Sequence, residues 1–215
     1  MTDTPPPQKP YCVLAEPCQH TLEEKRSLFH TYLFPIRNRE EALAQVETLR
    51  QEQPGASHYC WAYILGPADQ PQNQAFSDDG EPSGTAGKPM LNVLTQRGAS
   101  DCLAVIVRIF GGVKLGAGGL VRAYGGAVSR ALDNAQWREV TPTTPISVAV
   151  DFAHEERLRH QLQQDEITLC GVDYRQQVWL HIAVPLGEQQ RLESRVRELT
   201  SGQYQWQPSG RHRLD

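Results

Sequence analysis

The chain has 215 residues, 39% of them hydrophobic, which is enough for one large domain or two small ones, each with a core of its own. Its formal net charge of −4 argues against a protein coated in positive charge, so any nucleic-acid surface must be a confined basic patch. No apolar run approaches the roughly 20 residues of a membrane-spanning helix, and the polar N-terminus does not resemble a signal peptide, so we expect a cytoplasmic protein and no membrane contact.

The first ten residues are expected to form a disordered tail, because the segment 1–10 contains four prolines and no apolar periodicity. A first domain is predicted over 11–140. Its clearest element is a helix over Arg39–Glu52, which Asn38 can cap and Pro54-Gly55 stops. The other expected elements are a strand over Tyr11–Glu16, extended chain over Ser27–Phe34, a strand over His58–Leu65, a loop over Gly66–Lys88, a short helix near Pro89–Arg97, a strand over Cys102–Phe110 and a helix from about Gly119 to Asp133.

A second domain is predicted over 146–208, after a linker at Thr141–Pro145. Its patterns predict the order βαββαβ, which is the split-βαβ, ferredoxin-like arrangement. The chain as a whole is therefore expected to be an α/β protein, of the α+β kind. The elements expected in this domain are a strand over Ile146–Phe152, a helix over Glu155–Gln163, strands over Ile167–Tyr174 and Val178–Val184, a helix over Glu188–Thr200 and a strand over Gln203–Gln207.

Glycine is concentrated in one segment, since seven of the 17 glycines lie between Gly111 and Gly126. This segment follows a strand that looks buried and leads into a helix. A glycine loop that opens a helix exposes backbone N–H groups at the positive end of the helix dipole, where they can hold a phosphate or a carboxylate. The alternative is a tight turn with close helix packing, and the spacing matches neither standard glycine motif for nucleotides.

Basic residues gather around the same segment. From Lys88 to Arg130 there are six basic residues and one acidic residue, which is the confined patch that a net-negative nucleic-acid-binding protein would need. The alternative is that Arg97 and Arg130 are solvated helix charges and that a carboxylate pairs with Arg108 inside the protein. The candidate residues for binding nucleic acid or an anion are Lys88, Arg108, Gly111, Gly112, Lys114, Gly116, Gly118, Gly119 and Arg122.

A second informative segment, 76–90, holds three acidic residues, three hydroxyl residues and a lysine in a turn-rich loop. The acids could orient water, bind a metal or pair with Arg108. They lack the ligand order of a calcium loop, and the five scattered cysteines form no C-x-x-C pair, so we expect no metal and no cofactor. His58 and Cys60 stand too far apart along one strand face for a catalytic pair. No catalytic residue is assigned, and the possible polar site consists of His58, Asp78, Asp79 and Glu81.

Three blocks of sequence carry a resemblance to a known family. They are H-Y-C-W-A-Y at 58–63, F-S-D-D-G-E-P-S-G-T-A-G-K-P at 76–89 and R-I-F-G-G-V-K-L-G-A-G-G-L-V-R-A-Y-G-G at 108–126. In these blocks the chain resembles the YigZ/IMPACT family, and in particular its bacterial YigZ branch, because a βαββαβ unit follows. The resemblance implies an N-terminal domain with the left-handed βαβ fold of a ribosomal protein and the GHMP kinases, followed by a ferredoxin-like domain. That pairing is similar to the fourth and fifth domains of translation elongation factor G.

The resemblance also implies a connection with translation. Eukaryotic members of the family regulate translation by competing for a ribosome-associated scaffold; a bacterium lacks that pathway, so only the theme of RNA or ribosome contact carries over. We therefore predict a non-enzymatic RNA- or ribosome-binding protein, with a protein partner on the C-terminal domain as a further hypothesis. The alternative is a small-anion-binding protein or enzyme that uses the glycine-rich loop and the acidic loop as its site.

Overall fold

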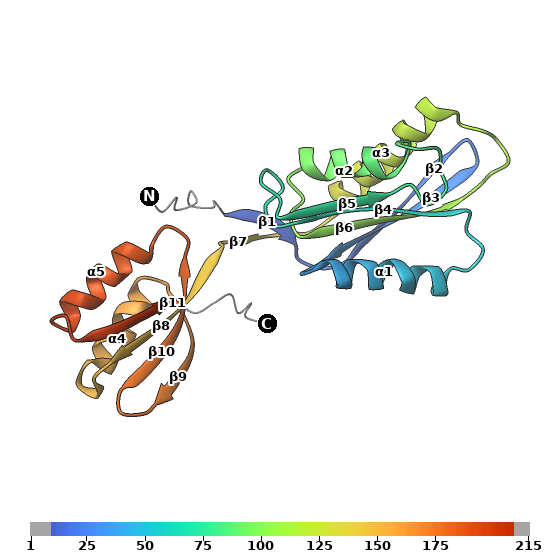
Figure 1. The fold of residues 1–215 in the computed structure, drawn as a ribbon. Coiled ribbons are helices and arrows are strands. Elements are labelled where there is room, and N and C mark those ends of the chain that lie inside the picture. The colour runs from blue at the N-terminus through green and yellow to red at the C-terminus, as the bar shows by residue number, and fades with distance from the viewer. Residues whose placement is uncertain (1–9, 209–215) are drawn as a thin grey trace. The chain divides into compact units, whose positions relative to one another are not determined.

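A computed structural model describes residues 10–208 of the chain (Figure 1). Its internal contacts divide the chain into two compact units, one over Tyr11–Val140 and one that begins at Thr141. Apart from Pro10, the predicted N-terminal tail lies outside the described residues. No helix within residues 10–208 is both long and apolar enough to cross a membrane.

The N-terminal unit consists of a five-stranded sheet, a two-stranded ribbon and three helices. Figure 1 shows that the first helix covers one face of the larger sheet and that the other two helices cover the opposite face. In chain order the elements are β1 (Tyr11–Leu14), β2 (Cys18–Glu24), β3 (Ser27–Pro35), α1 (Arg39–Glu52), β4 (His58–Leu65), β5 (Asn73–Ser77), α2 (Gly87–Gln96), β6 (Cys102–Ile109), α3 (Ala117–Asp133) and β7 (Trp137–Val140).

The larger sheet has the strand order β2-β3-β6-β4-β5, and each neighbouring pair is antiparallel. Because β3 and β4 both run antiparallel to β6 between them, they are parallel to each other, and α1 is the crossover that joins them. This is the βαβ unit that the family resemblance implies. The left hand of the crossover stays a prediction.

The two faces of the sheet have separate cores, as alternation along a strand requires. On β4, Cys60 and Ala62 pack in the core that includes residues of α2 and α3, whereas Tyr59 and Tyr63 pack in the core that includes residues of α1. The central strand β6 is fully buried from Cys102 to Val107. Alternating residues of β4 thus belong to two different cores.

The helix α1 has the bounds that the sequence predicts, and its cap explains why. The side-chain oxygen of Asn38 accepts a hydrogen bond of 2.8 Å from the backbone N–H of Glu41. The Glu41 carboxylate in turn accepts one of 2.8 Å from the N–H of Arg37. Two backbone donors that the helix itself cannot satisfy are thereby paired.

Three strands were not predicted from the sequence. The strand β5 lies within the predicted loop Gly66–Lys88, and both β5 and β2 are edge strands with mostly polar residues. The strand β7 pairs only with β1, which is far from it in the sequence. Edge and ribbon strands bury little apolar surface, so their sequences lack the alternation on which prediction depends.

The C-terminal unit has the element order βαββαβ, as predicted, and its antiparallel sheet has the order β11-β8-β10-β9. Its core includes Leu158 and Leu162 of the first helix and Leu192 and Val196 of the second. The predicted linker Thr141–Pro145 is partly strand. The elements are β8 (Thr143–Val150), α4 (Phe152–Gln164), β9 (Thr168–Tyr174), β10 (Val178–Pro185), α5 (Gln189–Leu199) and β11 (Tyr204–Pro208).

Candidate functional site

The segments that the sequence singles out meet at one end of the five-stranded sheet. The last residues of β6 pair with the start of both neighbouring strands, so that Arg108 stands opposite His58 and Phe29. The glycine-rich loop 110–119 leaves the sheet at this end, next to the two-residue turn that joins β2 to β3. The acidic loop 78–87 follows β5, the neighbour of β4, and leads into α2.

A buried ion pair between Arg108 and Glu81 lies at the centre of this end. Only 5% of Arg108 and 8% of Glu81 are exposed. The same Glu81 oxygen accepts a hydrogen bond of 2.8 Å from the Tyr124 hydroxyl on α3, and the Cys60 thiol donates to that hydroxyl over 3.3 Å. The pair therefore links the acidic loop to β6 and, through Tyr124, to α3.

The sequence left open whether Arg108 is an exposed binding residue or is paired with a carboxylate inside the protein. The ion pair with Glu81 shows that Arg108 is paired inside the protein. The guanidinium carbon also lies 5.4 Å from the ring centroid of Phe29 and 5.7 Å from that of Phe110, at distances where a cation is attracted to an aromatic face. Arg108 is therefore a structural residue and is not available as an exposed contact for phosphate.

The other two acids of the loop are also engaged inside the protein. Asp78 accepts backbone hydrogen bonds of 2.8 Å from Gly84, 3.0 Å from Ala86 and 2.8 Å from Gly87. Because Ala86 and Gly87 open α2, the Asp78 carboxylate satisfies donors at that helix N-terminus and faces the positive end of its dipole. Asp79 accepts a hydrogen bond of 2.6 Å from the N–H of Tyr59 and forms an ion pair with Arg50 of α1.

His58 is placed beside these acids but is held by the backbone. Its Nδ1 lies 2.8 Å from the backbone oxygen of Asp79, and because a carbonyl oxygen only accepts, Nδ1 carries the proton. Its Nε2 lies 3.9 Å from Glu81. Within residues 10–208 no group of three or more His, Cys, Asp or Glu side chains is arranged to hold a metal ion.

The thiol of Cys60 is placed for packing. Burial raises its pKa to about 12, although the hydrogen bond with Tyr124 opposes this, and the neighbouring acids raise it further. Burial likewise raises the pKa of the Tyr124 hydroxyl. A thiol with a raised pKa holds little thiolate at neutral pH, and the thiolate is the nucleophile.

We predict that Cys60 of the native protein resists alkylation by iodoacetamide at pH 8, while the exposed Cys12 and Cys170 react. Since folding raises the pKa from 9.0 to about 12, this thiol stabilises the native state fully below pH 9 and progressively less above it. Mass spectrometry of the peptides checks the order of modification, with protein unfolded in urea as the control. Modification of Cys60 at the rate of Cys170 would contradict the prediction.

The glycine-rich loop is pressed against the β2–β3 turn. A side chain at Gly111 would place its Cβ 2.0 Å from the backbone carbonyl carbon and oxygen of Arg26. The Gly111 N–H donates to the buried hydroxyl of Ser27 over 3.2 Å. The close-packing alternative therefore holds at Gly111, whereas Gly112 and Gly116 have positive φ and open space around them.

The N-terminus of α3 keeps the features of an anion site. Gly116 stands at the N-cap and offers no side chain, and no acidic residue lies in the first turn. Gly118 and Gly119 belong to that turn, and the guanidinium of Arg122 lies 3.5 Å from the position that a Cβ on Gly118 would take. The free N–H groups and this arginine could together bind a phosphate or a carboxylate.

The exposed basic residues around the loop define what we call the basic face. It includes three of the predicted binding residues and the two residues of the β2–β3 turn. The turn residues were not predicted from the sequence, because only the pairing of Glu24 with Ser27 in the folded chain defines the turn. Among the described residues none of its members forms an ion pair. The members are Lys25, Arg26, Lys88, Lys114 and Arg122.

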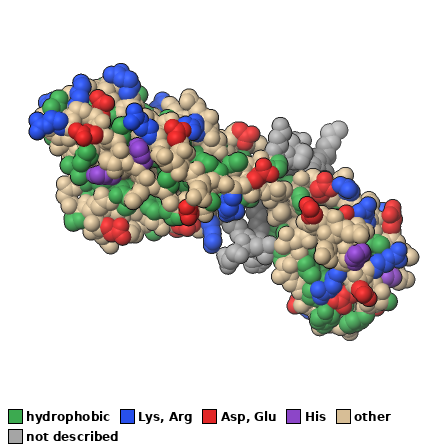
Figure 2. All heavy atoms as spheres, turned by 180° about the vertical axis from the view of Figure 1, so that it is seen from behind, with side chains coloured by type: hydrophobic (Ala, Val, Ile, Leu, Met, Phe, Trp, Pro, Cys, Tyr) green, Lys and Arg blue, Asp and Glu red, His purple; other side chains and the backbone are tan. Residues whose placement is uncertain are grey.

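The charge of the unit is divided between the two faces of the sheet. The helix α1 carries four glutamates and two arginines, whereas the only acid on α2 or α3, Asp133, pairs with Arg97 at 2.6 Å. Two exposed acids, Glu23 and Glu24, precede the β2–β3 turn. In Figure 2, Lys and Arg side chains gather at the upper left of the view, with a few Asp and Glu side chains among them.

Comparison with known proteins agrees with the resemblance. The model of the Impact N-terminal domain matches residues 25–132, and that of a domain of unknown function (DUF1949) matches residues 148–203. The chain is 37% identical to the IMPACT family member YigZ of Escherichia coli (strain K12), over 91% of this chain and 96% of that protein. The chain belongs to the IMPACT family. The predicted family is therefore confirmed.

Other IMPACT family members are similar over most of their length. The Bacillus subtilis (strain 168) member YvyE is 34% identical over 89% of this chain and 88% of its own. A solved structure described as that of a hypothetical protein is 35% identical, with a TM-score of 0.71, and covers 95% of this chain and all of its own. The predicted fold class, mixed α and β in an IMPACT N-terminal domain and a second domain, is confirmed.

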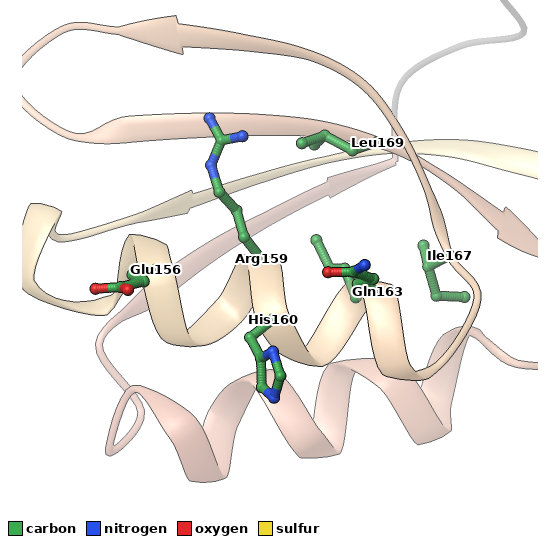
Figure 3. A pocket seen from close by; sticks show the side chains of 7 residues that line it. Glu156, Arg159, His160, Gln163, Ile167 and Leu169 are labelled. Atoms are coloured by element: carbon green, nitrogen blue, oxygen red, sulfur yellow. The ribbon is translucent and has the colours of Figure 1, made fainter.

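The C-terminal unit has a hollow between α4 and β9, but its polar side chains do not converge. Figure 3 shows Arg159 extending toward the sheet, while His160 and Glu156 point in other directions. Arg159 forms an ion pair of 2.9 Å with Glu155. The side chains that line this hollow therefore do not form a catalytic arrangement.

A chain of polar side chains crosses the sheet of the same unit. Ser147 Oγ lies 2.8 Å from His181 Nδ1, and His181 Nε2 lies 3.3 Å from Asp173, the order of residues in a hydrolase triad. Ser147, however, lies on β8, whose backbone pairs with β10 on one side and β11 on the other. Its neighbouring N–H groups are thus used in the sheet and cannot form the oxyanion hole that such a reaction requires.

Proposed function

We propose that this protein binds structured RNA, within the ribosome or outside it, through the basic face of its N-terminal unit, and that it does so without catalysis. The observation that carries the proposal is the concentration of five unpaired exposed cations around one glycine-rich loop in a chain of net negative charge. Binding to phosphates depends on such a local cluster and not on the net charge of the whole protein.

The state of the acidic loop supports a binding function over an enzymatic one. Its three acids are held by backbone N–H groups or by arginines, and the thiol of Cys60 has a raised pKa. A general base must be free to accept a proton from a substrate. In this site the carboxylates instead stabilise the loop that supports the basic face.

A small-anion receptor is the second candidate, and the uncapped N-terminus of α3 favours it. The N–H groups of this turn and the Arg122 guanidinium could hold a single phosphate or carboxylate. The same features would also bind a phosphate of an RNA backbone. The response to salt separates the two, because a polyanion that releases several counterions binds much more weakly as salt rises.

The test is a salt series of binding to ribosomes and to total RNA. We expect the affinity of the intact protein to fall steeply with salt. In the basic-face variant, Lys88→Ala with Lys114→Ala and Arg122→Ala, we expect weaker binding and a slope smaller by about 2 to 3, since each lost phosphate contact accounts for roughly 0.7 to 0.9.

A charge-matched variant is the control. It carries Arg39→Ala, Arg157→Ala and Arg191→Ala, three exposed arginines outside the basic face, and should bind as the intact protein does. Equal loss in both variants would mean that net charge alone is responsible. No binding by the intact protein at low salt would refute the proposal and turn attention to inorganic phosphate and small carboxylates.

The proposal also includes a role in translation and a protein partner for the C-terminal unit. A role in regulating translation follows from the resemblance to eukaryotic IMPACT family members, and a protein partner on the C-terminal unit follows from the same analogy. Both units carry more acidic than basic residues, 14 against 12 over 11–140 and nine against six over 143–208, so net charge does not choose between them. We place RNA on the N-terminal unit because the basic face lies there.

A further inference from the structure

Exposed apolar side chains stand at the end of β6, inside the basic face. Phe110 is 47% exposed, Ile109 is 44% exposed and Val113 is 40% exposed. Single apolar side chains on a surface need no explanation, but a contiguous group of them marks a site of interaction. These three lie within five consecutive positions, directly before Lys114 and beside Arg26.

The backbone on both sides of Phe110 is fixed. The Phe110 N–H donates to the Ser57 hydroxyl over 3.3 Å, and the Ser57 N–H donates to the carbonyl oxygen of Arg108 over 2.9 Å. The next residue, Gly111, is held by Ser27 and by its contact with the β2–β3 turn. The aromatic ring is therefore presented from a rigid support, which lowers the entropy that binding must offset.

The ring of Phe110 is also supported from within. The guanidinium carbon of Arg108 lies 5.7 Å from its centroid, and the ion pair with Glu81 keeps that guanidinium in place. A buried cation thus contacts the ring while nearly half of the side chain stays exposed. An aromatic surface of this kind is suited to stacking by a flat partner.

We propose that Phe110 is a stacking platform for an unpaired base of the RNA that the basic face binds. This inference rests on the proposed function and specifies its ligand. Proteins recognise unpaired nucleotides by stacking the base on an aromatic side chain while neighbouring cations contact the phosphates. In duplex RNA the bases are stacked on one another in a helix whose deep groove side chains cannot read, so Phe110 selects single-stranded or looped segments.

The surroundings of Phe110 favour a nucleic acid over a protein as the partner. The centre of a protein–protein interface is depleted of charged residues, whereas the backbone of Arg26 lies against Gly111, the residue after Phe110, and the exposed Lys114 follows four positions after the ring. The apolar area comes from three side chains only. A polyanion that carries flat bases satisfies both the cations and the ring.

The experiment compares a short single-stranded RNA with the duplex formed from it and its complement, each labelled for fluorescence anisotropy. We expect the intact protein to prefer the single strand, and Phe110→Ala to weaken single-strand binding about tenfold while duplex binding stays unchanged. Phe110→Trp should retain single-strand binding. Phe152→Ala is the matched control, since Phe152 is 52% exposed on the C-terminal unit, and it should change neither affinity.

The outcomes separate this inference from the function on which it rests. If Lys114→Ala with Arg122→Ala weakens binding but Phe110→Ala does not, the stacking role is wrong and the proposed function stands. If the intact protein binds neither RNA, both are wrong. Thermal unfolding of each variant shows whether Phe110→Ala is folded, and the retained affinity of Phe110→Trp distinguishes loss of the ring from loss of structure.

Discussion

Replacing Arg108 with methionine is expected to destabilise the protein by about 3–5 kcal/mol, the usual cost of leaving one partner of a buried ion pair without the other. The substitution keeps much of the apolar volume between Phe29 and Phe110 but leaves the Glu81 carboxylate buried, with Tyr124 as its close hydrogen-bond donor. The effect should be seen as a lower midpoint of unfolding in urea, with an unchanged dependence on denaturant.

A double variant tests whether the unpaired charge of Glu81 causes the loss of stability. With Arg108→Met and Glu81→Gln together, no ionised group is left buried at this position, so we expect less destabilisation than from Arg108→Met alone. The control is Arg50→Ala, which removes a partly exposed partner of Asp79 and should cost about 1 kcal/mol or less, because solvent screens that pair. A cost for Arg108→Met as small as that for Arg50→Ala would show that Glu81 reaches water.

Replacing Gly111 with alanine is the second large effect that we expect. The new Cβ would lie 2.0 Å from the Arg26 carbonyl group and 2.5 Å from the backbone nitrogen of Ser27. These are backbone atoms of a hairpin, so the clash can be relieved only by moving the β2–β3 turn away from the end of β6. We expect a loss of about 3 kcal/mol, at the upper end of the cost of overpacking.

The next residue provides a close control. Gly112 has a φ of +83° but nothing within 4 Å of an added Cβ, so Gly112→Ala should cost only the strain of a positive φ, about 1 kcal/mol. Urea unfolding measures both, and limited proteolysis of the folded variants should reveal a loosened loop in Gly111→Ala only. Equal destabilisation by the two substitutions would mean that the contact with Arg26 is not the reason for glycine at 111.

Elements with strong local signals could be predicted from the sequence. The bounds of α1 follow from Asn38 and from Pro54-Gly55, and the strand β4 follows from its apolar run and alternation. The strands β2, β5 and β7 could not be predicted in this way, because each owes its existence to a partner strand. For β7 that partner is β1, at the other end of the unit's sequence.

The candidate site was predicted in its composition but not in its arrangement. The sequence singled out the acidic loop and the glycine-rich loop, and it left open whether Arg108 faces solvent or a carboxylate. Only folding brings together Arg108 of β6, Glu81 of the acidic loop and Tyr124 of α3. The turn residues Lys25 and Arg26 join the basic face for the same reason, through the contact of Gly111 with the turn.

The sequence by itself thus determined the family, the βαββαβ order of the second unit and the two loops that form the site. These depend on local composition, caps and turn residues, which act over a few positions of the chain. The tertiary structure alone decided which charges are buried in pairs and which remain exposed. That division depends on side chains far apart in the sequence, because an arginine is available to a ligand only where folding has not given it a carboxylate.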